Sequence, residues 1–159
     1  MRTIVDLYPQ YRDRTYGDKI LVSIYYLRVM IERHLEKRLE PFGISAAQFR
    51  ALSVICEAGE AGMPVYNLQQ FVTEPGNGDV SRMIKRLENA GWVKRCPNKE
   101  DRRSVLAVAT PEGCDLIERL TSKRETLEID MPELDDEKGK ALYDNLQIMV
   151  DCFAKKRWR

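Results

Sequence analysis

Apolar residues recur every three or four positions along much of the chain, which is the spacing of one face of an α-helix. The longest series starts after Asp18 and stops at Pro41; its members are Ile20, Ile24, Leu27, Ile31, Leu35 and Leu39. Ser45, with Gln48 three positions later, has the capping-box pattern that opens a helix. We therefore expect a long helix over about residues 18–40 and a second helix after Ser45, preceded by an irregular or short helical arm.

Helical spacing continues, with interruptions, through the rest of the chain. Pro64 predicts the start of a short helix, and residues 74–78 have the Glu, Pro, Gly and Asn content of a turn. A further helix over about residues 80–90 buries Val80, Ile84 and Leu87 and ends at Gly91, a typical C-terminal glycine. Thr110 and Pro111 predict the start of a helix that runs to Met131, and residues 135–137 open a final one.

The periodicity changes between residues 92 and 109. Residues 92–96 and 104–109 are two strand-like runs, and the charged segment 97–103 separates them, which predicts a β-hairpin with a long tip. The order helix, helix, turn, helix, hairpin is that of a winged helix-turn-helix. The expected fold class is mainly α with a small β-hairpin wing, in a single domain over residues 1–159 whose winged lobe spans about residues 45–110.

Polar and basic side chains occupy the side of helix 80–90 opposite its apolar stripe. In a winged helix-turn-helix this helix enters the major groove of DNA, where such donors suit phosphates and base edges. Residues 77–103 carry a net charge of +4, while the whole chain carries +1. The candidate DNA-binding residues of helix and wing are Ser81, Arg82, Lys85, Arg86, Asn89, Lys94, Arg95, Lys99, Arg102 and Arg103.

The amino-acid composition argues against several other classes of function. The chain is 43% hydrophobic and 32% charged, with no apolar signal segment, so we expect a soluble cytoplasmic protein that contacts no membrane. The single histidine, His34, and the absence of a glycine-rich phosphate loop argue against an enzyme, a metal site or a bound cofactor. The four cysteines are widely spaced, which favours reduced thiols over a disulfide framework.

Two segments resemble one family of bacterial regulators. Residues 101–113, DRRSVLAVATPEG, are similar to the wing signature of the MarR family, and residues 80–93, VSRMIKRLENAGWV, are similar to its recognition helix and first wing strand. The resemblance extends over about residues 20–150. It implies a homodimer held by helical elements at about residues 1–42 and 111–159, which represses transcription from a palindromic double-stranded operator.

The resemblance also implies individual roles. The arginine that matches Arg103 reaches into the minor groove, and the aspartate that matches Asp101 holds that arginine by a salt bridge. Many members release DNA when a small aromatic molecule or an oxidant acts. Oxidant-sensing members use a cysteine near the start of the first helix, where this chain has none, so peroxide sensing is not expected; Cys96 is a candidate exposed thiol.

Simpler interpretations stay open for several residues. Arg82 and Lys85 could be solvated helix charges, Arg86 could form an intramolecular ion pair, and Asp101 with Arg103 could be a plain hairpin salt bridge. A candidate ligand cleft comprises Tyr16, Tyr25, Tyr26 and Cys56, although the tyrosines could instead pack an interface and Cys56 could be a core thiol.

The turn before the recognition helix departs from the family pattern. Residues 73–78 are about one residue longer than the common form, and Glu74 adds a negative charge near the expected phosphate path. This departure supports an alternative function, a winged-helix module that binds a partner protein and has no DNA specificity.

Overall fold

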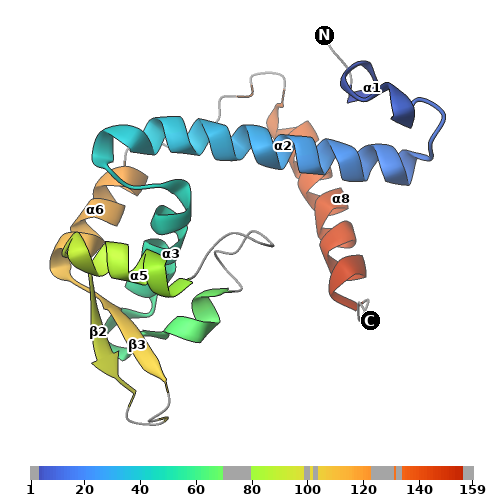
Figure 1. Ribbon diagram of the computed structural model, residues 1–159. Helices are drawn as coiled ribbons and strands as arrows, with labels where there is room; N and C mark the ends of the chain where they lie inside the picture. Colours follow the sequence, from blue (N-terminus) through green and yellow to red (C-terminus); the bar gives the residue numbers. More distant parts are fainter. Residues whose placement is uncertain are drawn as a thin grey trace. The chain divides into compact units, whose positions relative to one another are not determined.

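The chain divides into two compact units, Met1–Leu127 and Glu128–Arg159. The computed structural model describes residues 4–69, 80–98, 101, 104–122, 131 and 134–155. The first unit contains α1 (Ile4–Leu7), α2 (Tyr16–Leu39), α3 (Ala46–Glu57), α5 (Val80–Asn89) and α6 (Pro111–Ser122), with the strands β1 (Met63–Pro64), β2 (Val93–Pro97) and β3 (Val105–Ala109) (Figure 1). Single helical turns lie at η1 (Pro9–Tyr11), η2 (Glu40–Phe42), η3 (Gly59–Ala61) and η4 (Val65–Leu68). The second unit contains α8 (Asp136–Lys155).

The long helix α2 confirms the predicted first helix and begins two residues earlier than Asp18. Thr15 is its N-cap: the Thr15 hydroxyl accepts a hydrogen bond from the Asp18 amide at 3.2 Å, and the Asp18 carboxylate accepts one from the Thr15 amide at 3.2 Å. This capping box satisfies two amides that the first turn would otherwise leave unpaired. The helix ends at Leu39, because Pro41 in η2 cannot continue it.

Helix α3 begins where the sequence predicted. The Ser45 hydroxyl accepts from the Gln48 amide at 3.2 Å, and the Gln48 side chain accepts from the Ser45 amide at 2.9 Å. Two carboxylates of α2 bind the start of α3. Glu32 forms a bidentate ion pair with Arg50, with both contacts at 2.8 Å, and the Glu36 carboxylate accepts a hydrogen bond from the Ala46 amide at 3.0 Å. The orientation of α2 on α3 is thus fixed by polar contacts.

Removal of the Ser45 hydroxyl should destabilise the first unit measurably. Ser45→Ala leaves the Gln48 amide without its cap, which costs about 1 kcal/mol and lowers the melting temperature by about 2–4 °C. Thermal unfolding followed by circular dichroism measures this shift. Ser53→Ala is the matched control, because its hydroxyl only bonds back to the Phe49 carbonyl inside α3; equal melting temperatures for the two variants would refute the capping role.

The hydrophobic core lies within the winged part of the first unit. Helix α2 contributes to it mainly through its C-terminal end, while α3, α5, α6, η4 and the sheet supply most of the rest. The largest fully buried side chains are Leu39, Leu52, Ile55, Leu68, Ile84, Leu87 and Leu120. Much of the apolar stripe of α2 stays exposed within the chain: Ile20, Ile24, Leu27 and Ile31 are 38–55% exposed.

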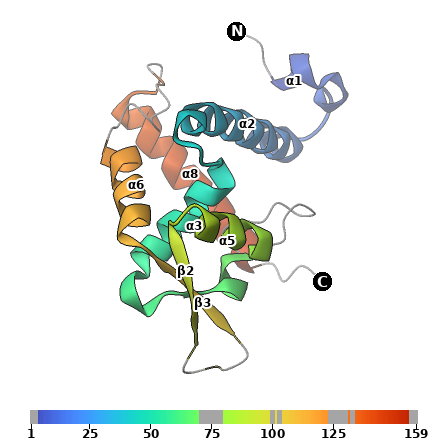
Figure 2. The same ribbon diagram turned by 60° about the vertical axis from the view of Figure 1, so that its left-hand side comes forward.

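The wing is part of a three-stranded antiparallel sheet with the order β1-β3-β2. Strands β2 and β3 confirm the predicted hairpin, with Val93 opposite Ala109 and Pro97 opposite Val105, and they project from the helices of this unit (Figure 2). Strand β1 was not predicted: the sequence placed a helix start at Pro64, whereas Met63 and Pro64 pair with Ala107 and Leu106 before η4 begins. An edge strand tolerates proline because its outer amide needs no partner.

Parts of the prediction fall outside the described residues. These are Val72, the turn at residues 73–78, and residues 123–130 of the predicted helix, which include Leu127. In the described part of the chain, no helix is long and apolar enough to cross a membrane. The single-domain expectation stays a prediction.

Helix α8 confirms the predicted final helix, which begins after Asp135. The Asp135 carboxylate accepts a hydrogen bond from the Lys138 amide at 2.9 Å and forms an ion pair with the Lys138 ammonium at 2.8 Å. These contacts with Lys138 lower the pKa of Asp135. Within its own unit α8 leaves several apolar side chains exposed, namely Leu142, Tyr143, Leu146, Ile148, Val150 and Phe153.

Candidate nucleic-acid interface

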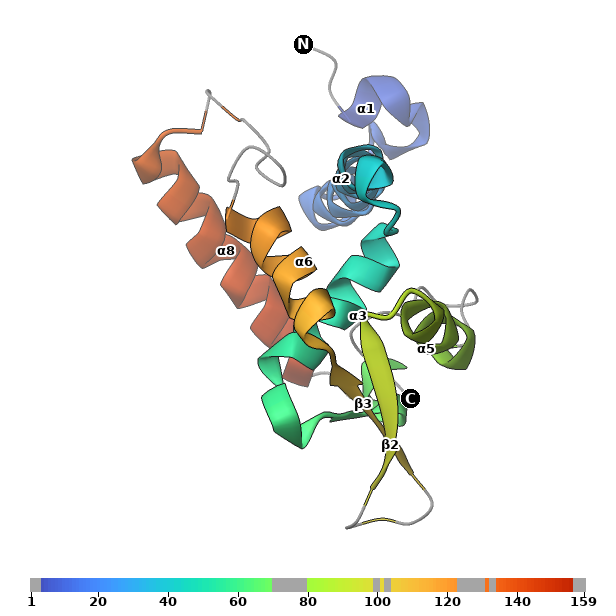
Figure 3. The same cartoon turned by 90° about the vertical axis from the view of Figure 1, so that its left-hand side faces the viewer.

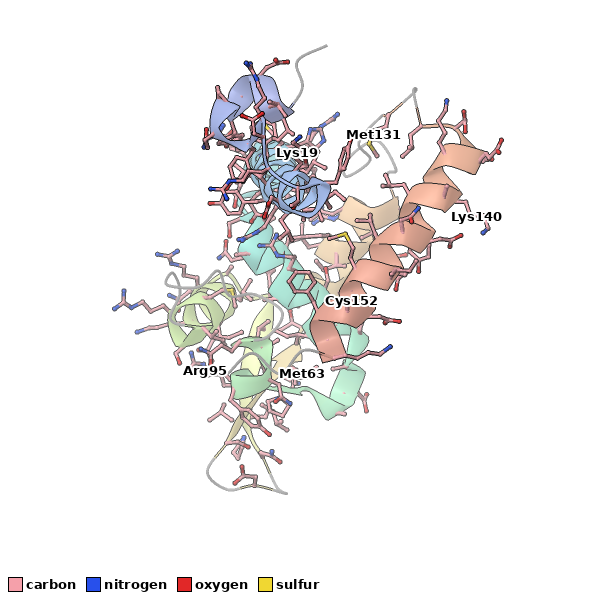
Figure 4. All side chains as sticks on the ribbon, turned by 90° about the vertical axis from the view of Figure 1, so that its right-hand side faces the viewer. Lys19, Met63, Arg95, Met131, Lys140 and Cys152 are labelled. Atoms are coloured by element: carbon pink, nitrogen blue, oxygen red, sulfur yellow. The ribbon has the colours of Figure 1, made fainter. Side chains whose placement is uncertain are left out.

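Helix α5 separates its anchoring side chains from its polar ones. Ile84 and Leu87 are completely buried, and Val80 packs against the same core. The five predicted donors of this helix, Ser81, Arg82, Lys85, Arg86 and Asn89, are all exposed. Side chains with nitrogen tips extend from α5 away from the core of the first unit (Figure 4). The structure therefore gathers the predicted helix residues on one accessible surface, which we call the α5 face.

A tight turn fixes the end of α5. Gly91 has φ +78°, the left-handed conformation that favours glycine, and the Gly91 and Trp92 amides donate to the Glu88 and Leu87 carbonyls at 3.0 Å. These two bonds form a Schellman motif and confirm the predicted glycine stop. The chain thus turns directly from α5 into β2, and the helix and wing share a short connection.

Arg95 of β2 links the wing to α5. Its guanidinium donates to the Ser81 carbonyl at 3.0 Å and lies 3.4 Å from the Glu88 carboxylate, and it lies beside α5 (Figure 4). The sequence proposed Arg95 as a DNA contact, and that role stays a prediction. The structure also shows that Arg95 positions β2 relative to α5, because it contacts residues near both ends of that helix. Its neighbour Lys94 is exposed on the other side of the strand.

Hydrogen bonds order the described part of the wing tip. The Asp101 carbonyl accepts from the Ser104 amide at 2.9 Å and from the Ser104 hydroxyl at 3.1 Å, and the Asn98 side-chain amide donates to that hydroxyl at 2.8 Å. Lys99, Arg102 and Arg103 lie outside the described residues, and with them the expected salt bridge from Asp101. The Asp101 side chain is exposed.

The first turn of α6 packs against the corner between α5 and β2. The Thr110 hydroxyl accepts from the Gly113 amide at 3.1 Å, which confirms Thr110 as the cap, and donates to the Gly91 carbonyl at 2.7 Å. The Thr110 amide donates to the Trp92 carbonyl at 3.0 Å. The sequence did not predict this contact, since residues 91 and 110 carry no signal that relates them.

The candidate ligand cleft is spread over two helices. Tyr16, Tyr25 and Tyr26 lie on α2, and Cys56 lies in the last turn of α3. Tyr16 is 83% exposed and Tyr25 is 61% exposed, while the Tyr26 ring meets the Tyr8 ring edge-on at 6.1 Å. Cys56 is half-buried and contacts Cys114 of α6. The cleft stays a prediction.

Clusters of metal ligands and surface hollows are the other features that could support chemistry. Among the described residues, no three His, Cys, Asp or Glu side chains are grouped as metal ligands. An open hollow of about 680 Å³ lies on the sheet and is lined in part by Pro64, Lys94, Cys96 and Leu106. What the described residues assemble is a polar helix surface beside an ordered wing.

Comparisons with known proteins agree on one family. The MarR family model matches residues 44–105. The multiple antibiotic resistance protein MarR of Salmonella typhimurium is 34% identical over 60% of this chain, and the regulator PecS of Dickeya dadantii is 29% identical over 65%. The chain spans just under two thirds of these relatives, 65% and 63% of their lengths. PecS is named as a helix-turn-helix transcriptional regulator.

Solved structures extend the similarity to most of the chain. A mutant of Escherichia coli MarR in complex with operator DNA is 28% identical, with a TM-score of 0.66 over 80% of this chain and 90% of that one. MepR of Staphylococcus aureus, solved with DNA, has the same fold at 21% identity, with a TM-score of 0.69 over 88% of this chain and 99% of that one. The winged-helix arrangement, the matched segment and these structures together show that this chain has the winged-helix fold of MarR-family regulators and is similar to that family over residues 44–105.

Proposed function

We propose that this protein is a sequence-specific, double-stranded DNA-binding transcriptional regulator that acts as a homodimeric repressor on a palindromic operator. The observation that carries the proposal is the α5 face, with five polar or basic residues exposed on a helix whose apolar side is fixed in the core. The Arg95 contacts with Ser81 and Glu88 hold the wing beside that surface. The complex of E. coli MarR with operator DNA supports the same conclusion.

The α5 face suits the major groove by shape and by chemistry. The major groove of B-DNA admits one α-helix, and the exposed Arg82 and Lys85 can donate to phosphates or to guanine edges. Asn89 can pair with adenine through its amide. Phosphate contacts supply affinity that depends on salt, and base contacts supply the sequence preference. The wing then contacts the neighbouring backbone or minor groove.

The proposed dimer rests on apolar surface that the single chain leaves exposed. Ile20, Ile24, Leu27 and Ile31 form a row along α2, and α8 carries its own exposed apolar side chains. Monomeric proteins rarely expose such continuous apolar surface. We assign dimerisation to residues 1–42 and 111–159, with the lobe at 45–110 left to bind DNA. A two-fold dimer would read two half-sites about one helical turn, ~34 Å, apart.

Release by a small aromatic effector and action in the cytoplasm, where bacterial operators lie, belong to the same proposal. The exposed tyrosines of α2 are the residues that we would examine first for an effector. Isothermal titration would measure the affinity of the protein for small aromatic acids with and without operator DNA. An effector that releases DNA should bind the free protein more tightly than the DNA complex, because the coupling between the two ligands is reciprocal.

The experiment that tests the proposed function is a DNA titration. The protein is titrated by fluorescence anisotropy against a duplex from upstream of its own gene and against a scrambled duplex, each at two salt concentrations. We expect a preference of about 10³-fold or more for the upstream duplex, and affinity for both that falls steeply with salt. No binding to either duplex at low salt would contradict the proposal and favour the protein-interaction module.

Arg103 should contribute affinity without contributing sequence preference. Because the matching arginine in the family reaches the minor groove, Arg103→Ala should weaken binding several-fold on the operator and on scrambled DNA alike. The same anisotropy titration measures both. Arg119→Ala on α6 removes an equal charge outside the proposed interface and is the control. Full affinity of Arg103→Ala at moderate salt would refute the proposed role of the wing.

A further inference from the structure

Two cysteines that are distant in the sequence meet between α3 and α6. The Sγ atoms of Cys56 and Cys114 lie 3.2 Å apart, although 58 positions separate the residues along the chain. Cys56 lies in the last turn of α3 and Cys114 in the first turn of α6, and these helices pack against each other (Figure 3). Both thiols are free.

The distance between the two sulfur atoms is close to that in a disulfide bond. A disulfide has an S–S length of about 2.05 Å, so the two sulfur atoms need to approach by only about 1.2 Å. Side-chain rotation with a small shift of one helix end can supply such a movement. Cys96 and Cys152 are also free, and the structure places neither of them in a thiol pair with another described cysteine.

We propose that Cys56 and Cys114 form a redox-active dithiol site, which a hydroperoxide converts into a disulfide between α3 and α6. This site is separate from the start of the first helix, where the lack of a cysteine led us to expect no peroxide sensing from the sequence. In the first step the Cys114 sulfur attacks the peroxide, the O–O bond breaks, and Cys114 becomes a sulfenic acid while an alcohol or water leaves. In the second step the Cys56 sulfur attacks the Cys114 sulfur, the S–O bond breaks, and the proton of Cys56 leaves with the oxygen as water. Two thiols are oxidised and one peroxide is reduced.

The surroundings of the two thiols fix their order of reaction. Cys114 is exposed and meets the oxidant first, whereas Cys56 is half-buried. Burial, followed by the hydrogen bond and charge of Cys114, raises the pKa of Cys56 to about 12. Cys56 therefore stays protonated at neutral pH and reacts only with a partner already beside it. The thiolate is the reactive form of cysteine, so a half-buried and protonated Cys56 suits a resolving role.

Disulfide formation would act on the corner that positions α5. Cys114 follows Gly113, whose backbone lies so close to the Trp92 carbonyl that an added Cβ would come within 2.3 Å of its oxygen. The Thr110 hydroxyl bonds the Gly91 carbonyl in the same corner at 2.7 Å. The Thr110–Gly91 hydrogen bond and the Gly113–Trp92 contact would transmit a shift of the first α6 turn to the end of α5. If the protein binds an operator as proposed, this shift should make the oxidised protein bind its operator about tenfold more weakly than the reduced protein.

The test uses the reduced full chain, hydrogen peroxide and peptide mapping by mass spectrometry. We expect a Cys56–Cys114 linked peptide, the loss of two of the four thiols and reversal by dithiothreitol. Cys56→Ser should stop at a sulfenic acid on Cys114 that dimedone traps, and Cys114→Ser should form no linked peptide. Cys96→Ser, half-buried like Cys56, and Cys152→Ser, exposed like Cys114, are the matched controls and should react as the wild type does.

Several outcomes would overturn the dithiol site. These are equal oxidation of all four cysteines, a linkage that involves Cys96 or Cys152, or no linked peptide from a chain whose circular dichroism is native. Cys56→Ala replaces Cys56→Ser if the serine variant unfolds. The mapping needs no DNA, so a linked peptide in a protein that never binds DNA would refute the proposed function alone. A linked peptide with unchanged operator affinity would refute the coupling to α5.

Discussion

Gly113→Ala is expected to lower the free energy of unfolding by about 2 kcal/mol. Gly113 is buried in the first turn of α6, and a Cβ at this position would lie 2.3 Å from the Trp92 carbonyl oxygen and 3.1 Å from its carbon. Both are backbone atoms of the turn that joins α5 to β2, so no side chain can rotate away. The higher helix propensity of alanine, worth about 1 kcal/mol, offsets only part of the strain.

Chemical denaturation followed by circular dichroism measures this loss, and the melting temperature should fall by about 4–8 °C. Gly139→Ala in α8 is the matched control, because the nearest atom to its added Cβ is a Leu134 side-chain carbon at an ordinary 3.9 Å. That variant should be equally stable or more stable than the wild type. If Gly113→Ala were as stable as Gly139→Ala, α6 would not pack on the α5–β2 corner as described.

Lys85→Ala is expected to lower operator affinity by at least about tenfold. Lys85 is exposed at the middle of the α5 face, one residue after the buried Ile84, so the substitution leaves the core intact. A lost contact is worth about 1–3 kcal/mol, and a dimer loses two of them. The melting temperature should stay within about 2 °C of the wild type, since exposed substitutions are nearly neutral.

The same variant distinguishes a contact with the DNA phosphates from a contact with a base. If Lys85 binds phosphate, affinity falls equally on operator and scrambled DNA and the dependence on salt becomes shallower. If it reads a base, the ratio of the two affinities falls. Lys140→Ala on α8 removes an exposed lysine that pairs with Asp144 and is the control. Operator affinity of Lys85→Ala within twofold of the Lys140→Ala value would exclude Lys85 from the interface.

Local patterns were sufficient to predict most of the elements. The capping box at Ser45, the stop at Gly91 and the Thr110 cap each depend on residues within a few positions of one another, and the structure confirms them. Strand β1 was missed because two residues that include Pro64 show no alternation. Its pairing with β3 arises from tertiary contacts that sequence patterns do not contain.

The site was predictable only where one helix defines it. Periodicity placed Lys85 and its neighbours on the α5 face because they share a helix with the buried Ile84 and Leu87. It could not predict that Arg95 spans Ser81 and Glu88, or that Cys56 meets Cys114, since these contacts join separate elements. Periodicity also could not show that the α2 stripe is left exposed within one chain.

The most direct test of the central claim, specific DNA binding through a two-fold dimer, is selection from random duplexes. The protein is incubated with a pool of random double-stranded DNA, bound molecules are recovered through successive rounds, and the enriched sequences are read. We expect enrichment of an inverted repeat whose half-sites are about 10 base pairs apart, and loss of that enrichment in Lys85→Ala. A folded protein that enriches no sequence after repeated rounds would contradict it.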